Sequence, residues 1–369
     1  MIRHVLCVTT ALAAPLLTSA ANAETFDEAA LLAVAQSEPP LMVIDSTGKV
    51  REQVKGFTAK YGLEANGTKS EAPGTIRMVM GEAQAGNVQA DVLVISDTPA
   101  AVAQLITPGL AISYLPSDMV DTIPAAARDP LVISNSPVVW TYNTALHAAC
   151  PVSNIWALTD PPWSGRVAMP DPLGKPAYTD WFNQFATHHD AAFADAYAAH
   201  YGKPLESDRA SAAEAWVAAM AANKPLLVES DTDSAEAVGA PDATETFIGI
   251  MSTAKFRDND DGMKLGICSG MQPFAGLMTP KFALITAGSD SPNAARLFVH
   301  YLLTDEGWAP QAIDGKLATN TTHAPMADEP SGVGALMDQM WFYNTSSSDG
   351  DWTTRQDWQD IWSIALAGE

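Results

Sequence analysis

Cysteine is scarce in this chain, which restricts the chemistry it can carry. The sequence has 3 cysteines, and no two of them are spaced as C-x-x-C. Neither a thiolate zinc site nor a dithiol redox motif is therefore predicted. Cys7 lies in a segment that we expect to be removed, which leaves Cys150 and Cys268. Two cysteines in an oxidising compartment favour one disulfide, and two separate buried thiols are the alternative.

Positive charge is also in short supply. The chain has 20 Lys and Arg residues against 43 Asp and Glu residues, a formal net charge of −23. Such a surface repels nucleic acid and anionic lipid, so we exclude both as partners. It does not exclude an anionic ligand, because a binding site is governed by its local charges and dipoles.

Motifs of enzyme chemistry are missing as well. The sequence contains no G-x-S-x-G turn, no H-E-x-x-H pair and no Walker A loop, so we predict neither an enzyme nor a bound cofactor. A hydrolase built on Glu229 or Asp231 would need a nucleophile and base that the sequence does not offer. The cluster at 188–190 has two adjacent histidines, whose side chains on a helix point about 100° apart and rarely share one metal ion. A solvated helix surface, a polar ligand contact and a metal site are its three interpretations.

The first residues have the pattern of a secretory signal. Arg3 and His4 precede a short apolar run at 5–14, and Ala-Asn-Ala at 21–23 matches a cleavage site. We therefore predict that residues 1–23 are a cleaved signal peptide and that the mature protein works in the periplasm. An anchor helix is the alternative, although the apolar run is shorter than the roughly 20 residues that span a bilayer. No later segment is long and apolar enough to do so.

The first third of the chain alternates strand and helix patterns. Short apolar runs predict strands, apolar residues at helical spacing predict helices, and glycines at 62 and 86 end two of them. Thr98 is expected to cap a further helix that has Pro99 at its first position. This order indicates an α/β fold with a parallel sheet. The expected strands are 41–44 and 90–96, and the expected helices are 50–61, 76–83 and the one from Thr98.

The rest of the chain continues with longer elements and no internal repeat. We expect strands at 131–141 and 282–285, helices at 182–201 and 210–222, a helix opened by Pro292, and a last amphipathic helix with Trp358 and Trp362.

Hydroxyl-bearing residues recur where three predicted strands end. They are Ser46-Thr47-Gly48, Ser96-Asp97-Thr98 and Ser134-Asn135-Ser136. Ligands of open parallel sheets bind beyond the carboxyl ends of the strands. Hydroxyls and free N–H groups at these ends suit an anionic or polyhydroxylated solute, and ordinary helix capping is the alternative interpretation.

Three segments resemble a known family. Residues 154–172 carry W-x-L-x-x-P-x-W-x-G-R-V followed by P-D-P, residues 291–307 carry S-P-N-A-A-R-L-F and later D-E-G, and residues 88–92 read V-Q-A-D-V. Together they resemble type II periplasmic solute-binding proteins, in the branch with ferric-ion-binding and sugar-phosphate-binding members.

The resemblance implies an architecture and a role. It implies a two-lobed α/β fold in which each lobe is a mostly parallel sheet flanked by helices. Lobe one would comprise 24–134 plus 277–369, and lobe two 135–276. A monomer would capture a small solute between the lobes and deliver it to the membrane permease of an ABC importer. Cys150 and Cys268 flank the second lobe, so we predict that they are bridged.

The resemblance also bears on the solute. Ferric-binding members use adjacent tyrosines, whereas residues 228–250 contain none and read Glu229-Ser230-Asp231 near their start. We therefore expect an anionic organic solute, a sugar phosphate or another organophosphate. A metal-ion receptor is the alternative, with Glu229, Asp231, His188 and His189 as donors. Further candidate contacts are Thr68 and Lys69, with an ordinary surface lysine as the alternative for Lys69, and Tyr178 and Thr179 in a family loop of lobe two.

Overall fold

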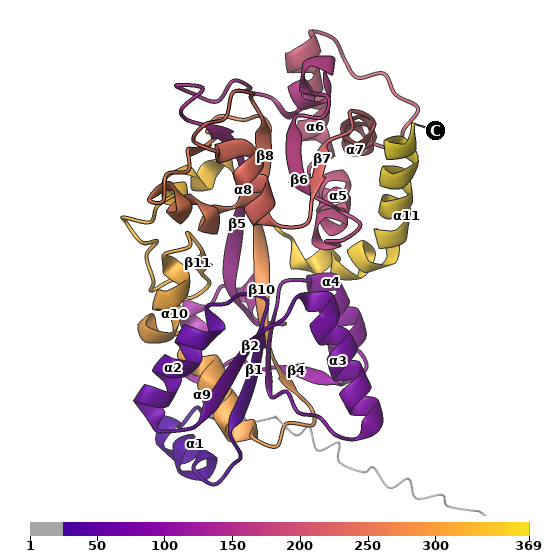
Figure 1. The fold of residues 1–369 in the computed structure, drawn as a ribbon. Helices are drawn as coiled ribbons and strands as arrows, with labels where there is room; N and C mark the ends of the chain where they lie inside the picture. Colours follow the sequence, from indigo (N-terminus) through magenta and orange to yellow (C-terminus); the bar gives the residue numbers. More distant parts are fainter. Residues whose placement is uncertain (1–24, 369) are drawn as a thin grey trace, which may run out of the picture.

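Two long strands join two α/β lobes in this protein (Figure 1). The computed structural model describes residues 25–368, so the signal peptide predicted at 1–23 lies outside the described residues. No helix within that span combines the length and the apolar character that a bilayer crossing demands.

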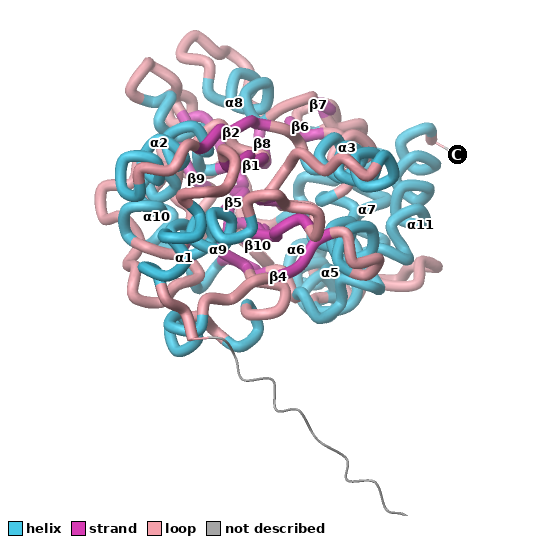
Figure 2. The backbone as a smooth tube through the Cα atoms, turned by 90° about the horizontal axis from the view of Figure 1, so that it is seen from below, coloured by secondary structure: helices cyan, strands magenta, loops and turns pink. Residues whose placement is uncertain are grey.

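The first lobe is built on three parallel strands. β1 lies between β2 and β3, and helices cover the sheet on both sides (Figure 2). Two separate apolar clusters fill the spaces between the sheet and these helices. The elements of this lobe are α1 (Glu28–Ala35), β1 (Leu41–Asp45), α2 (Val50–Tyr61), β2 (Ala65–Lys69), α3 (Ala72–Ala85), β3 (Val92–Ile95), α4 (Thr98–Ala101), α9 (Pro292–Leu302) and α10 (Asp305–Ala312).

Local sequence explains where these elements begin and end. Gly62 and Gly86 end α2 and α3 with φ of 70° and 65°, the left-handed conformation that glycine adopts without a steric cost. The start of α4 differs from our prediction by one residue. Asp97 is its cap, because the Asp97 carboxylate accepts a hydrogen bond from the Ala100 N–H at 3.1 Å, and Thr98 is the first helical residue.

The second lobe repeats the same architecture. β6 lies between β7 and β8, all parallel. The helix predicted at 182–201 is two helices, separated at His189, whose backbone is not helical. The elements are β6 (Val167–Pro170), α5 (Ala177–His188), α6 (Asp190–Tyr201), α7 (Ala212–Ala222), β7 (Leu226–Val228), α8 (Asp231–Gly239), β8 (Ile248–Ser252) and β9 (Leu265–Ile267).

β5 (Val132–Asn143) and β10 (Gly276–Thr286) cross from one lobe to the other. They pair antiparallel and give one continuous sheet in the order β2-β1-β3-β10-β5-β8-β6-β7. Three further short strands add to this pair: β4 (Ala111–Ser113), β11 (Leu317–Ala318) and β12 (Met340–Phe342). The lobe boundaries that we predict at 134 and 276 fall in β5 and at the start of β10. They stay a prediction.

The last helix, α11 (Ser348–Ala367), lies beside α5 and α7 (Figure 1). Trp358 and Trp362 belong to the apolar cluster of the second lobe, where the Trp362 ring stacks on Phe182 with centroids 5.6 Å apart. The sequence-based division places 277–369 in the first lobe. Because of this packing, we propose that α11 belongs with the second.

Cys150 and Cys268 form a disulfide, as predicted. They are 118 residues apart in sequence, and the chain between them holds most of the second lobe. Closing so long a loop removes entropy from the unfolded chain.

We expect the Cys150→Ala/Cys268→Ala protein to lose about 2–4 kcal/mol of unfolding free energy relative to the oxidised protein. Urea denaturation of both proteins measures the difference. Thiol titration of the denatured, unreduced mature protein is the control and should give no free thiol. Two thiols per chain would contradict the bridge.

Candidate ligand-binding site

A cleft of about 1060 Å³ lies between the lobes. Its walls come from the carboxyl ends of strands in both lobes, with Ser46 and Ser96 after β1 and β3, and Asp171 and Ser252 at β6 and β8. Its floor comes from β5 and β10, including Ser136 and Thr279. The cleft thus occupies the position where α/β sheets bind ligands.

Four helices start at this cleft. The residues that line it include the turn before α2 and the first turns of α3, α5 and α8. The N-terminal end of each helix carries unpaired N–H groups and a partial positive charge, which favour anions. Gly48, in the turn before α2, has an N–H without a protein partner within residues 25–368. No described atom lies within 4 Å of the position that a β-carbon on Gly48 would occupy.

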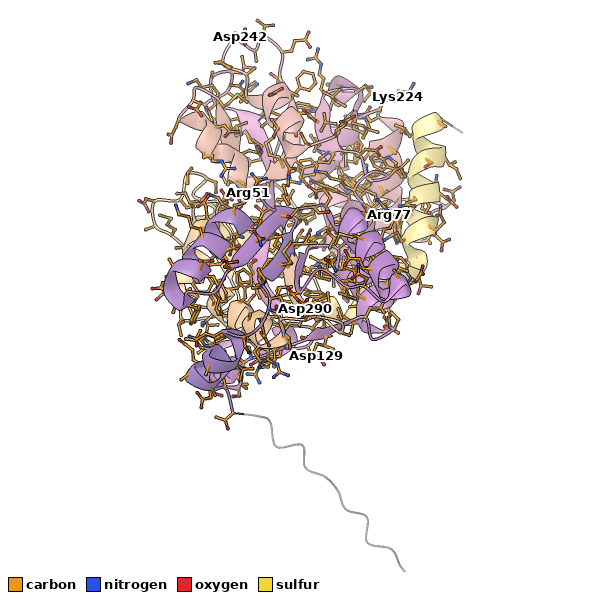
Figure 3. The ribbon with its side chains drawn as sticks, turned by 60° about the horizontal axis from the view of Figure 1, so that its bottom comes forward. Arg51, Arg77, Asp129, Lys224, Asp242 and Asp290 are labelled. Atoms are coloured by element: carbon orange, nitrogen blue, oxygen red, sulfur yellow. A yellow bond between two sulfur atoms is a disulfide. The ribbon has the colours of Figure 1, made fainter. Side chains whose placement is uncertain are left out.

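Positive side chains are concentrated here. Seven of the chain's 20 Lys and Arg residues line the cleft, compared with 6 of its 43 Asp and Glu residues. Arg77, on α3 (Figure 3), and Lys175 make no ion pair within residues 25–368. A strongly acidic protein therefore has a cleft in which positive side chains slightly outnumber negative ones. Its cations are Lys69, Arg77, Lys175, Lys255, Arg257, Lys281 and Lys316, and its anions are Glu71, Asp97, Asp171, Glu229, Asp231 and Asp314.

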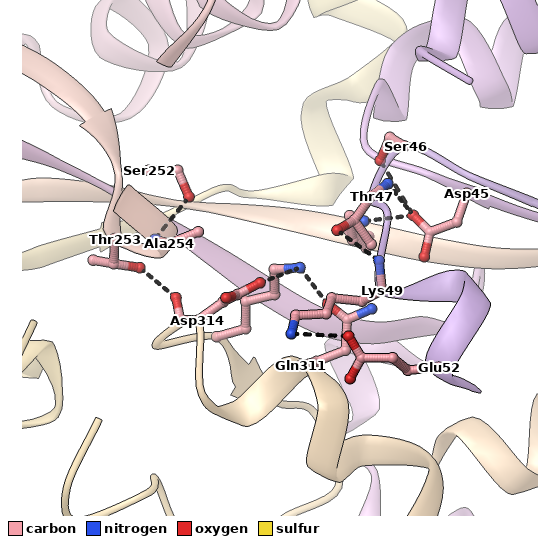
Figure 4. Close-up of polar contacts among 12 residues, drawn as sticks. Asp45, Ser46, Thr47, Lys49, Glu52, Ser252, Thr253, Ala254, Gln311 and Asp314 are labelled. Carbon is pink, nitrogen blue, oxygen red and sulfur yellow. Dashed lines mark hydrogen bonds and ion pairs between the residues drawn. The ribbon is translucent and has the colours of Figure 1, made fainter. Parts of the chain in front are cut away.

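A buried ion pair lies under the first-lobe wall. Lys281 Nζ is 2.6 Å from Asp45 Oδ1, and the two side chains are only 5% and 1% exposed. The same carboxylate accepts a hydrogen bond from the Thr47 N–H at 2.9 Å (Figure 4). Asp45 thereby fixes both the lysine and the turn that leads into α2.

Lys316 lies beside this pair and is almost as deeply buried, at 7% exposure. Its ammonium donates to the side-chain oxygen of Gln311 and is 4.0 Å from Asp314. Arg257 already binds Asp314 at 2.6 Å. Burial, and then the nearby Lys281, lower the pKa of Lys316 to about 7.

The second-lobe wall is organised by the start of α8. Ser230 and Asp233 form a capping box there, with the Ser230 hydroxyl accepting from the Asp233 N–H. Lys255 donates to the Thr232 hydroxyl at 2.8 Å. Burial, and then Asp231, raise the pKa of the Tyr178 phenol well above its ordinary value, so it stays a neutral donor.

Nine of the thirteen ligand contacts predicted from the sequence line this cleft. Thr68 lies outside it on the exposed part of β2. Contrary to our prediction, Ser134 and Asn135 lie inside β5 and not at the end of a strand; Ser134 is buried, and Asn135 pairs with Leu317 of β11. Thr179 donates to the Pro176 carbonyl at 2.7 Å. The nine are Ser46, Thr47, Lys69, Ser96, Asp97, Tyr178, Glu229, Ser230 and Asp231.

Asp97 is already bound within the protein. The Arg355 guanidinium, from α11, donates to both Asp97 oxygens at 2.7 and 3.3 Å. It also donates to both oxygens of Asp180, from α5, at 2.9 and 2.7 Å. Arg355 thus links a carboxylate of the first lobe to one of the second, and sequence reasoning missed it.

The donors considered for a metal ion are not assembled. Within residues 25–368, no group of three His, Cys, Asp or Glu side chains could hold one. His188 pairs with Ser347 at 3.0 Å, and His189 stacks on Trp341 with ring centroids 3.8 Å apart. Neither histidine lines the cleft that Glu229 and Asp231 line.

Comparison with known proteins gives a family and a fold. The family described as bacterial extracellular solute-binding protein matches residues 44–313. No curated protein matches the chain in sequence. Many solved structures share the fold, as expected from the resemblance to type II periplasmic-binding proteins.

Three of these structures illustrate the degree of similarity to this chain. The substrate binding protein of an ABC transporter from Agrobacterium tumefaciens is 16% identical, with a TM-score of 0.69 over 91% of this chain and 96% of its own. Iron-bound HitA from Pseudomonas aeruginosa is 15% identical, with a TM-score of 0.64 over 89% and 99%. The periplasmic binding protein AfuA from Actinobacillus pleuropneumoniae, with exogenous fructose-6-phosphate bound, is 20% identical, with a TM-score of 0.63 over 89% and 98%.

Proposed function

The chain belongs to the bacterial extracellular solute-binding proteins, and from that premise we propose that it captures a small anionic organic solute in the inter-lobe cleft. The solute class is a sugar phosphate or another organophosphate. The mature protein works in the periplasm and delivers the solute to the membrane permease of an ABC importer. It is a binding protein and not an enzyme, in agreement with its family.

The observation that supports this proposal best is the charge of the cleft. About a third of the chain's scarce cations line it, together with the starts of four long helices. Cations and helix N-termini each stabilise a bound anion, and both are stronger in a cleft that excludes water. In so acidic a chain, an anionic ligand explains why so many cations lie at one place.

The two lobes offer different groups for such a solute. In the first lobe, Ser46, Thr47 and Lys69 surround the turn before α2 and the end of β2. In the second, Lys255 and the neutral phenol of Tyr178 line the cleft, together with Ser230, whose hydroxyl already donates to Asp233 at 2.9 Å. We propose that the first-lobe groups bind the anionic part, and that the second-lobe hydroxyls bind hydroxyl or ring groups.

An iron receptor is less well supported. Fe³⁺ favours hard anionic oxygens, and Tyr178, the one tyrosine that lines the cleft among residues 25–368, has a raised pKa. HitA is described as iron-bound and AfuA as bound to fructose-6-phosphate, but their low identity to this chain does not choose between them.

A thermal-shift panel on residues 24–369 tests the proposal. The panel contains sugar phosphates, phosphonates, carboxylates, neutral sugars and Fe³⁺. We expect a phosphorylated compound to stabilise the protein most, by about 2.7 kcal/mol at a hundredfold excess over Kd. Lys69→Met should weaken the effect, whereas Lys203→Met, on the exposed surface away from the cleft, should not. Stabilisation by Fe³⁺ alone, or equally by neutral sugars, would refute the proposal.

A further inference from the structure

Lys316 is a cation of the cleft whose charge is not balanced by a close ion pair. Its carboxylate neighbour, Asp314, is 4.0 Å away and is bound by Arg257 at 2.6 Å. The adjacent Lys281 has Asp45 as its partner at 2.6 Å. A protonated Lys316 is therefore a buried positive charge on the cleft wall whose nearest carboxylate is already bound more closely by Arg257.

The nearest acceptor of Lys316 is neutral and rigidly oriented. Gln311 Nε2 donates to Gln53 Oε1 at 3.1 Å, and Gln53 Nε2 donates to the Gly307 carbonyl at 2.9 Å. This chain of amides directs the Gln311 oxygen to the lysine. An amide oxygen accepts a hydrogen bond from a neutral amine as well as from an ammonium. Lys316 is thus held in one place in either protonation state.

We propose that Lys316 and the turn at Gly48 bind the anionic group of the solute, and that Lys316 takes up one proton from water as this group enters. The inference rests on the proposed function and specifies how that site recognises charge. The Gly48 N–H supplies a donor without a protein partner, at the start of the 12-residue helix α2. The proton is added to Lys316 Nζ, and the solute stays chemically unchanged.

Charged groups from several elements face Lys316 and set its proton affinity. The cations disfavour a protonated Lys316 and the carboxylates favour it, and burial acts with the cations to bring its pKa to about 7. An anion at the Gly48 turn adds a negative charge and raises the pKa again. The groups are Asp45 from β1, Lys49 before α2, Lys281 from β10, and Asp314 after α10 with its partner Arg257.

The test uses inorganic phosphate as the probe, with its apparent Kd taken from thermal-shift titrations at constant ionic strength from about pH 7 to pH 9. For the wild type we expect the Kd to rise with pH, by up to about tenfold per unit, the slope for uptake of one proton. Because phosphate changes from monoanion to dianion near neutral pH, sulfate, which stays a dianion over this range, is titrated as a second probe and should show the same slope. Lys316→Arg keeps its charge at every pH and should bind with a flat profile.

Two further variants complete the design. Lys316→Met should lose phosphate stabilisation at every pH, and Lys203→Met should behave as wild type. Thermal melting without phosphate checks that each variant is folded. If a variant is not folded, the pH profile of the wild type still shows whether a proton is taken up on binding.

Three outcomes would overturn the inference. They are a flat wild-type profile, unchanged binding in Lys316→Met, and no phosphate stabilisation of the wild type. Each leaves the proposed function standing if the organic panel still yields an anionic solute. The proposed function fails separately, if no organic anion in that panel binds.

Discussion

Replacing Arg355 with methionine should lower the unfolding free energy by about 3–5 kcal/mol near pH 8, the usual cost of removing one partner of a buried ionic group. Arg355 contacts both oxygens of Asp97 and of Asp180, whose side chains are only 6% and 2% exposed. Its loss would leave two neighbouring buried carboxylates with their main cation removed. Urea denaturation of wild type and variant measures the difference.

The pH dependence of this loss has a definite sign. Burial already raises the pKa of Asp180 well above its ordinary value while Arg355 is present, and removing the guanidinium raises it further. A carboxyl group with a raised pKa in the folded state is stabilising while protonated and loses that stabilisation as the pH rises. The deficit of Arg355→Met should therefore be smaller at about pH 5 than at about pH 8.

Rescue distinguishes a charge effect from lost packing. Asp97→Asn/Asp180→Asn/Arg355→Met removes the unpaired charges and should recover much of the loss, while Arg355→Lys should be intermediate because it cannot bind both carboxylates bidentately. A deficit that is independent of pH and unrelieved by the asparagines would contradict the role of Arg355 as an ionic link between the lobes.

Lys281→Met should destabilise the protein by a similar amount, about 3–5 kcal/mol. It leaves Asp45, 1% exposed, with the Thr47 N–H and the Ser46 hydroxyl as donors. Chemical denaturation measures the change, and Asp45→Asn/Lys281→Met should recover most of it.

Lys203→Met, which removes a lysine from an exposed loop, is the matched control and should change stability by less than about 0.5 kcal/mol. If Lys281→Met were equally mild, Asp45 would not depend on the lysine, and the ion pair would not stabilise the first-lobe wall.

The elements that the sequence predicted well carry strong local signals. β1 and β3 are fully apolar or nearly so, and α2 and α3 end at glycines with positive φ. β2 was not predicted, because its sequence Ala-Asn-Gly-Thr-Lys has no apolar pattern. It forms because β1 offers a parallel edge for it to pair with. The packing of α11 on the second lobe likewise depends on tertiary contacts of Trp358 and Trp362 that periodicity alone cannot assign.

The candidate site likewise contains residues that the sequence predicts and residues that it does not. The hydroxyls after β1 and β3 could be found from the sequence, since they follow recognisable strands, and Ser46, Thr47 and Ser96 line the cleft. The third predicted set, at 134–136, lies within β5 and does not end a strand. Lys281 and Lys316 could not, because they are 35 positions apart in sequence and each looks like an isolated surface lysine. Only the crossing of β10 and the return of the chain after α10 bring them together beside Asp45. Arg355 is similarly isolated in sequence from both of its carboxylates.

Calorimetric titration with a matched pair of compounds tests most directly whether the cleft recognises the negative charge of an organic solute. The pair is the phosphorylated compound that stabilises the mature protein most and its unphosphorylated parent. Charge-assisted hydrogen bonds contribute about 1.5–3 kcal/mol each. The unphosphorylated parent lacks the anionic group, and the loss of two such bonds should weaken its binding by at least about a hundredfold. Equal affinity for the two compounds, or binding of Fe³⁺ and neither compound, would contradict the account.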